Sequence, residues 1–324
     1  MRWMIGVVCG LAVLWGGYWF VGSTALERAT AQWFADQPAQ GREASYSSLA
    51  VDGFPSRFDM TITDVHLADP ASGFGWDAPF VQILTLSYTP WHVIAALPNS
   101  QTMRSPAGDI TVQSAKLQAS VVVIPGPGLA LDHITLVGST LAADGPGWSL
   151  GAAEMRLASR RDPSRDDAHQ IGVEVLGLTP DPALITALGQ MSPLPRNVDR
   201  LHLDATATLT APLDRYTTSV HTTEIVVKEA LMVWGDLTLN ASGTLVAGTD
   251  GRATGRIVVT AENWRLLIPV MVAAGVVDAG VAPTVENMMA ALAKPGATAL
   301  ELPITFANGR ISLGPLPIGI APLM

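Results

Sequence analysis

Apolar and polar side chains alternate with a period of two over much of the chain, and this pattern restricts the fold more than any other feature. Phe58, Met60 and Ile62 alternate with aspartate and threonine, and the same period recurs in residues 201–210 and 237–245. Alternation of this kind is typical of β-strands, because successive side chains of a strand point to opposite faces of the sheet. Strands with one polar face belong to antiparallel sheets that have one solvated side.

About a dozen segments fit this description. They are residues 58–63, 81–87, 110–123, 131–141, 149–158, 171–178, 201–210, 219–228, 237–245, 254–261, 299–306 and 310–314. The intervals between them lack the helices that parallel βαβ units require. We therefore expect a mainly β fold, in which an N-terminal transmembrane helix precedes a curved antiparallel sheet of about a dozen strands with a few packing helices.

Four segments predict helices. Residues 24–36 continue helically from the N-terminus, residues 89–97 begin with Pro90, and residues 181–190 open with an aspartate cap before a proline. Residues 262–293 contain twelve consecutive apolar residues, 266–277, which are too few to span a bilayer and too apolar for an exposed helix. We expect this last helix to fill the concave side of the sheet, and a lid over a lipid-binding groove is the alternative.

The N-terminus predicts a membrane anchor. Nineteen residues from Trp3 to Val21 carry no charge, and at 1.5 Å per residue they span roughly the 30 Å hydrocarbon core of a bilayer. Arg2 precedes this run, so the positive-inside rule puts the N-terminus in the cytoplasm. The expected location is the inner membrane, as a single-pass protein with most of the chain in the periplasm. A signal peptide cleaved after Ala25 is the alternative.

Composition excludes several classes of protein. Hydrophobic residues make up 48% of the chain and charged residues 15%, which excludes a disordered protein. The net charge of −9 argues against nucleic acid as a partner. Cys9 is the single cysteine, so a disulfide framework and a multi-cysteine zinc site are excluded.

Charge distribution suggests how the chain is divided. Residues 159–170 hold three arginines and three aspartates and almost no apolar residue, which predicts a polar loop or hinge. We expect an anchor over residues 1–23, a first β-rich half over 24–158, and a second β-rich half over 171–324 that includes the apolar helix 262–293.

Sequence motifs for catalysis are absent. The chain contains no nucleophile elbow, no paired-histidine zinc motif and no glycine-rich phosphate loop, and its six histidines include no pair four residues apart. We expect no catalytic residues, no metal ligands and no cofactor, and therefore a protein that is not an enzyme.

Turn motifs carry a resemblance to a known family. Gly53-Phe54-Pro55-Ser56-Arg57-Phe58 forms a turn before a strong strand, Glu262–Leu267 reads ENWRLL, and Asn308-Gly309 joins the final alternating segments within LPITFANGRISLGPLPIG. With the N-terminal anchor, these segments resemble an uncharacterised bacterial family, domain of unknown function 2125, found chiefly in alphaproteobacteria. The chain is more distantly similar to AsmA-like envelope proteins, and that similarity implies a link to lipid movement or outer-membrane assembly.

Two functions follow from this sequence. A sheet with one apolar face and an apolar helix would form a concave site for lipid or lipid-like groups, with membrane lipid as the partner. The candidate lipid-facing or core residues are Leu203, Leu209, Leu237, Leu239, Trp264, Leu267 and Met271. The alternative is an envelope scaffold or assembly factor with a filled core and no ligand, whose partners are other envelope proteins.

Overall fold

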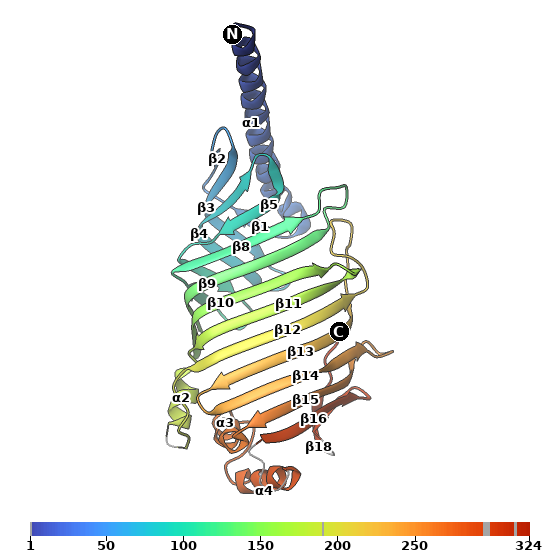
Figure 1. Ribbon diagram of the computed structural model, residues 1–324. Helices are drawn as coiled ribbons and strands as arrows, with labels where there is room; N and C mark the ends of the chain where they lie inside the picture. The colour runs from blue at the N-terminus through green and yellow to red at the C-terminus, as the bar shows by residue number, and fades with distance from the viewer. Residues whose placement is uncertain (1, 190, 294–298, 314–315) are drawn as a thin grey trace. The chain divides into compact units, whose positions relative to one another are not determined.

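The computed structural model describes residues 2–189, 191–293, 299–313 and 316–324 (Figure 1). The chain forms two compact units. Unit 1 comprises Met1–Ile124 and Leu136–Gly147, and unit 2 comprises Pro125–Thr135 and Trp148–Met324. The described part of the chain is mainly β, as expected, but it contains 18 strands rather than about a dozen. Most of the additional strands, such as β1 (Glu43–Ser45) and β2 (Ser48–Asp52), are three to five residues long, too short for an alternation to be recognised, whereas the eight-residue β5 (Thr89–Ala96) takes the place of a predicted helix.

One helix, α1 (Arg2–Asp36), begins unit 1 and contains both the uncharged run and the segment 24–36, which confirms the continuous helix expected there. Among the described residues it is the one helix long and apolar enough to cross a membrane. Most of its first eighteen residues are exposed, whereas Trp19 and Phe34 are buried. The helix ends before a 3₁₀ turn, η1 (Pro38–Gln40), which Gly41 closes with a φ of 75°.

The strands of unit 1 pair antiparallel. They are β1 (Glu43–Ser45), β2 (Ser48–Asp52), β3 (Arg57–Asp69), β4 (Phe74–Leu86), β5 (Thr89–Ala96), β6 (Ser100–Arg104), β7 (Ile110–Gln113) and β8 (Lys116–Val123). The long strand β3 pairs with β1, β2 and β4, and β4 continues to β5 and β6. The prediction of a helix over residues 89–97 is therefore wrong, since Thr89–Ala96 form a strand. The β-branched Val93 and Ile94 join a ladder between β4 and β8, and that pairing overrides the helix start suggested by Pro90.

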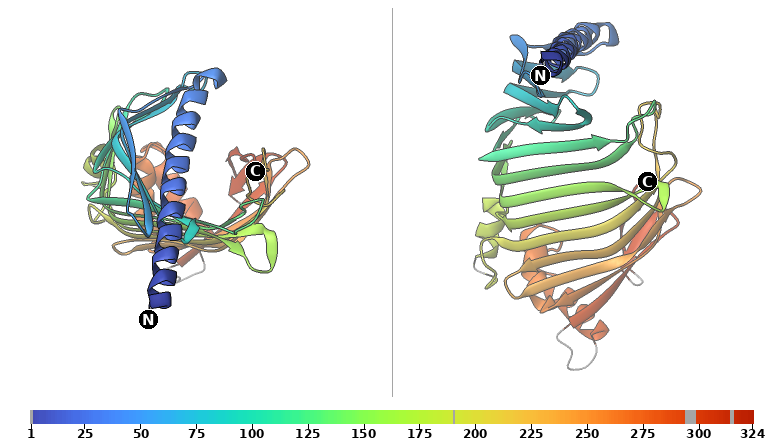
Figure 2. Two further views of the ribbon diagram at one scale, coloured as in Figure 1. Left: turned by 90° about the horizontal axis from the view of Figure 1, so that it is seen from above. Right: turned by 45° about the horizontal axis from the view of Figure 1, so that its top comes forward.

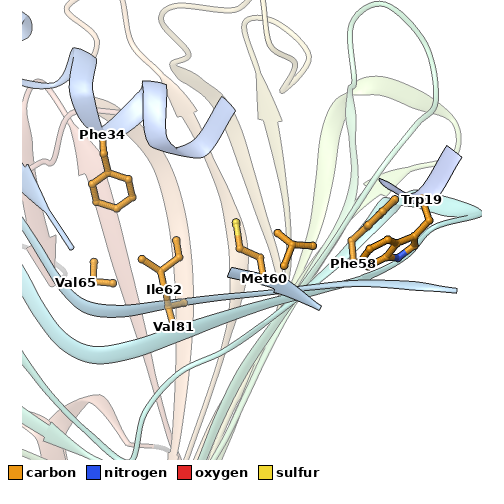
Figure 3. Close-up of a cluster of buried hydrophobic side chains, with 8 residues drawn as sticks. Trp19, Phe34, Phe58, Met60, Ile62, Val65 and Val81 are labelled. Atoms are coloured by element: carbon orange, nitrogen blue, oxygen red, sulfur yellow. The ribbon is translucent and has the colours of Figure 1, made fainter. Parts of the chain in front are cut away.

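The core of unit 1 lies between α1 and the β3–β4 ladder (Figure 3). Phe58, Met60 and Ile62 are buried at 7%, 3% and 3% exposure, and they face Trp19 and Phe34 of α1. The intervening Asp59, Thr61 and Thr63 are only half-buried. The alternation that predicted this strand thus also predicted which side α1 covers.

The strands of unit 2 form a meander in which each long strand pairs antiparallel with the next. They are β10 (Trp148–Asp162), β11 (Arg165–Leu178), β12 (Val198–Leu209), β13 (Thr222–Trp234), β14 (Leu237–Ala247), β15 (Ala253–Glu262), β16 (Ala299–Ala307), β17 (Arg310–Leu313) and β18 (Leu316–Ile320). One further strand, β9 (Leu131–Gly145), belongs partly to each unit. In Figure 2 the strands β11 to β14 lie side by side.

The polar segment 159–170 is neither a long loop nor a hinge. Its first four residues end β10, its last six begin β11, and only two residues between them form a turn. Arg160 pairs with Gln170 and Arg161 with His169, so the polar residues belong to the ladder itself. Paired backbone groups satisfy one another whatever side chains they carry, which is why a charged run can continue a strand.

The helical segments of unit 2 are shorter than expected. The helix α2 (Pro182–Leu188) begins at Asp181, whose carboxylate accepts a hydrogen bond from the Ala183 amide, and this confirms the predicted cap. The prediction of a single helix over residues 262–293 is wrong. Strand β15 continues to Glu262, and the rest forms η2 (Trp264–Leu266), α3 (Leu267–Ala273) and α4 (Ala282–Leu292). Gly275, with a φ of 70°, interrupts the helix after α3.

The predicted turns at Gly53 and Asn308-Gly309 are confirmed. Gly53 has a φ of 100°, and its carbonyl accepts hydrogen bonds from the Ser56 and Arg57 amides. Asn308 and Gly309 have φ values of 52° and 72°, the positive pair that a two-residue type I′ hairpin requires. Gly314 and Pro315 of the final motif lie outside the described residues.

Close approach of β14 and β15 generates a testable prediction. A Cβ at Gly243 would lie 2.1 Å from the Arg256 carbonyl oxygen, whereas a Cβ at Gly172 of β11 would meet no atom within 4 Å. Gly243→Ala should therefore lower the free energy of unfolding by on the order of 2–3 kcal/mol, and Gly172→Ala should change it by less than about 0.5 kcal/mol. Denaturant unfolding followed by circular dichroism measures both, and equal effects would contradict the close approach.

Candidate functional site

Unit 2 presents one apolar face across seven neighbouring strands, β10 to β16. Paired residues of an antiparallel ladder point to the same face, so the strand pairings assemble rows of side chains. The first row consists of Met155, Val175, Leu201, Met232, Leu239, Ala261 and Leu300. The second row consists of Leu157, Val173, Leu203, Ala230, Ala241, Val259 and Leu302. We call the side of the sheet that carries these rows the apolar face.

Two further rows extend the apolar face. The third row consists of Ser159, Ile171, Ala205, Val227, Gly243, Ile257 and Ile304. The fourth row consists of Arg161, His169, Ala207, Ile225, Leu245, Gly255 and Phe306. Seven strands about 4.8 Å apart make each row roughly 29 Å long.

The opposite face of the same strands is polar and internally paired. The carboxylate of Glu174 accepts hydrogen bonds from Arg200 Nε at 2.6 Å and pairs with His202 Nδ1 at 2.7 Å. The Arg200 hydrogen bond holds the pKa of Glu174 below its usual range and raises that of Arg200. Lys228 and Asp204 form a more exposed pair at 3.3 Å. This face is a solvated surface whose charges balance one another.

Helical segments cover one end of the apolar face. Trp264 and Ile268 are buried, at 1% and 7% exposure. They pack with Met289 of α4 and with two strand residues, Ala261 of β15 and Leu300 of β16. A second cluster joins α2 to the neighbouring strands through Leu188, Val198 and Trp234, with Leu201 and Val270 packed against it. Seen from above (Figure 2, left), α3 and α4 lie inside the curve of the strands. These helices act as a plug over the first row, as the sequence analysis favoured for this segment.

The rest of the apolar face is only partly covered. In the second row Leu203, Ala230 and Ala241 are half-buried, and in the third row Ile171 and Ile257 are half-buried. The clusters to which the helices of unit 2 contribute reach Val259 and Leu302 of the second row, but the hydrophobic clusters formed by the described residues do not include Leu203. The apolar face is therefore filled at one end and accessible beyond it.

The predicted site residues divide between these two regions. The structure brings together Leu239, Trp264, Leu267 and Met271, which belong to the cluster under the plug. Leu237, at the start of β14, is fully buried. Leu203 lies in the second row, outside the plug, and Leu209 is half-buried at the far end of β12. Sequence alternation identified the correct face for Leu203 but could not show that it lies beyond the plug.

Sequence reasoning missed a polar corner of this face, which consists of Ser159, Arg161 and His169. His169 is 3% exposed, and its Nδ1 lies 3.2 Å from the Ser159 hydroxyl. Burial lowers the pKa of His169, the charge of Arg161 lowers it further, and Asp132 opposes the shift. The only signal in the sequence was the charged run 159–170, which we interpreted as a loop or hinge.

The chemistry available to these residues is limited. A serine hydrolase needs a histidine that contacts both the serine and an orienting carboxylate, but Nε2 of His169 has no hydrogen-bond partner in the described structure. The described residues also contain no group of three metal-ligating side chains. What the apolar face offers is hydrophobic area.

Comparison with known proteins identifies a family. A family model described as "Uncharacterized protein conserved in bacteria (DUF2125)" matches residues 19–322, which confirms the resemblance carried by the turn motifs. Neither the curated proteins nor the solved structures contain a match. The similarity to AsmA-like proteins therefore has no counterpart among these comparisons.

Burial of His169 generates a prediction about pH. Unfolded histidine titrates near pH 6.5, whereas the folded pKa of His169 lies below that value. Between the two pKa values the unfolded chain binds a proton that the folded chain does not, so stability should fall as pH drops below about 6.5. His169→Asn should flatten this dependence, measured as the free energy of unfolding between pH 7.5 and 5.0.

Exposed His221 provides the control for this measurement. His221→Asn should leave the pH dependence of the wild type unchanged. Identical slopes in the wild type and in His169→Asn would show that His169 does not titrate differently in the folded state.

Proposed function

The chain belongs to this family of uncharacterised bacterial proteins, DUF2125, and we propose that it is an inner-membrane-anchored periplasmic protein that binds the acyl chains of lipid on the apolar face of unit 2. The observation that carries the proposal is that Leu203 of the second row and Ile171 and Ile257 of the third row stay half-buried beyond the plug. A sheet face that served only as a core would be buried like Leu300 and Trp264, which are 0% and 1% exposed.

The dimensions and chemistry of the face suit an acyl chain. Each row runs roughly 29 Å across seven strands, and the hydrocarbon of one lipid leaflet is about 15 Å thick. Burial stabilises an acyl chain by about 0.8 kcal/mol per methylene, so a chain lying along a row gains affinity without any polar contact. Side chains such as Leu203 and Ile257 contribute the complementary apolar surface.

Features of α1 support the proposed location. The helix is long and apolar enough to cross a membrane, Arg2 is the one charged residue before the apolar run, and Glu27 and Arg28 follow it. By the positive-inside rule this arrangement favours a cytoplasmic N-terminus. A periplasmic position for both units follows from that orientation.

The alternative function is an envelope scaffold that binds another protein by strand addition. Strand β18 pairs with β17, and its Ile318 and Ile320 are 56% and 73% exposed. An extended segment of a partner could add to such a strand through backbone hydrogen bonds. This candidate requires no ligand on the apolar face.

Site-specific photocrosslinking separates the two functions. A benzophenone side chain introduced at Leu203 or Ile257, both on the apolar face beyond the plug, should crosslink to phospholipid in intact cells, because the proposed acyl chains contact these positions. The same group at Ser242, which is exposed on the opposite face, should crosslink to no lipid. Absence of lipid at both apolar positions, with a protein captured from Ile318, would favour the scaffold.

Matched charge variants extend this test. Ala241 lies in the second row, and the next residue, Ser242, points to the other face. Ala241→Glu should abolish the lipid crosslink from Leu203, since it places a carboxylate among acyl chains, whereas Ser242→Glu should leave it unchanged. Circular dichroism of both variants shows whether the fold is retained.

Topology is tested separately. Alkaline phosphatase fused to the C-terminus should be active, because that enzyme folds only in an oxidising compartment, and the purified protein should retain its original N-terminus. A mature chain that begins near Leu26 would identify a cleaved signal peptide and would contradict the anchor.

A further inference from the structure

Two hairpin tips of unit 1 are held against the apolar part of α1. The indole Nε1 of Trp15 donates a 2.8 Å hydrogen bond to the Pro55 carbonyl in the β2–β3 turn. The hydroxyl of Tyr18 donates a 2.7 Å hydrogen bond to the Ser87 carbonyl in the β4–β5 turn. Both helix residues belong to the uncharged run that ends at Val21.

A third contact fixes the helix beside the same tips. Trp19 Nε1 donates a 2.6 Å hydrogen bond to the Arg57 carbonyl, and its ring packs on Phe54 and Phe58 with centroid separations of 5.4 and 6.0 Å. At Gly22 a Cβ would lie 2.7 Å from the Phe58 ring, so the helix approaches β3 more closely than a larger residue would permit. These contacts place the tips at a defined level along α1.

That level lies inside the apolar run. Trp15 precedes Val21 by six residues, or about 9 Å along a helix, and Tyr18 precedes it by three residues, or about 4.5 Å. Side chains of a helix also lean toward its N-terminus, which moves the contacted carbonyls further in that direction. Depths of about 5–10 Å correspond to the boundary between lipid headgroups and acyl chains.

The side chains at the tips are apolar, aromatic and exposed. Phe54 is 56% exposed, Tyr88 is 55% exposed, and Leu86 and Trp91 are each 37% exposed. In water, a cluster of this kind leaves aromatic surface unburied, whereas tyrosine and tryptophan are favoured at membrane interfaces. The carbonyl of Arg57 accepts the Trp19 hydrogen bond, and the Arg57 guanidinium pairs with Asp59 at 3.0 Å.

We propose that the β2–β3 and β4–β5 turns insert into the lipid leaflet from which α1 emerges, so that Phe54 and Tyr88 contact the bilayer. The occupant of this aromatic surface is therefore the lipid bilayer itself, because the surface is continuous with a helix that spans it. The inference rests on α1 crossing the membrane, which is part of the proposed function, but it is independent of any lipid on the apolar face of unit 2.

Spin labels on the full chain test this insertion. In a Cys9→Ala background, Phe54→Cys and Tyr88→Cys carry a nitroxide in nanodiscs of phosphatidylethanolamine and phosphatidylglycerol. Both labels should collide with oxygen, which concentrates in the bilayer, several-fold more than with a water-soluble nickel chelate. Phe54 packs on Trp19, whereas none of the ring contacts between described residues involves Tyr88. The label at position 88 therefore still tests the insertion if Phe54→Cys disturbs the fold.

Phe74 is the matched control. Phe74 is 59% exposed in the same unit, and together with Trp33 of α1 it lines a pocket of 330 Å³. Trp33 lies twelve residues beyond Val21, or about 18 Å further along α1. A label in Phe74→Cys should collide mainly with the nickel chelate. Labels at 54 and 88 that behave like the one at 74 would overturn the inference.

A label on native Cys9 separates the two possible failures. Cys9 is exposed in the middle of the apolar run, so its label should give the highest ratio of oxygen to nickel collisions. If the label at Cys9 collides mainly with oxygen but the labels at positions 54 and 88 do not, α1 spans the membrane and the tips stay outside it. If the label at Cys9 collides mainly with the nickel chelate, α1 does not span the membrane, and both the anchor hypothesis and the present inference are wrong.

Discussion

The structure depends on one constraint of the antiparallel ladder: each long strand commits alternate side chains to opposite faces, and the apolar face must then be covered. In unit 1, α1 provides the cover, since Trp19 and Phe34 pack over Phe58, Met60 and Ile62. In unit 2, α2, α3 and α4 provide it for the first row and for Val259 and Leu302 of the second row. The contrast between the buried face of β3 and the half-buried residues of unit 2 is the physical basis for proposing a ligand on unit 2.

Partial cover has an energetic meaning. Side chains such as Leu203 and Ile257 stay half-buried, so part of their hydrophobic stabilisation is available to whatever binds over them. The opposite face offers less apolar surface, because it carries charged groups such as Glu174, Arg200 and His202, which satisfy one another. An apolar ligand therefore has one preferred side of this sheet.

Helix α1, which is long and apolar enough to cross a membrane, is joined to the strands of unit 1 through specific contacts. Its indole and phenol groups donate hydrogen bonds to carbonyls of the turns at Pro55, Ser87 and Arg57, which a bilayer could not satisfy. The same helix thus contributes a candidate membrane span, a core face for β3 and β4, and partners for the polar backbone at the hairpin tips. These roles explain why the uncharged run ends in a group of aromatic residues.

Local sequence patterns determined most of the long strands, the continuous N-terminal helix, the cap at Asp181 and the hairpin at Asn308-Gly309, because each depends mainly on neighbouring residues. Only the tertiary structure decided the remainder. Strand pairing made β5 from a segment with a helix-like start and continued β10 and β11 through a charged run. Pairing also aligned Leu203 with Ala230 and Val173, and packing placed the plug over Leu239 rather than over Leu203. Alternation defines the face of a residue, but which rows are covered depends on contacts between segments far apart in the chain.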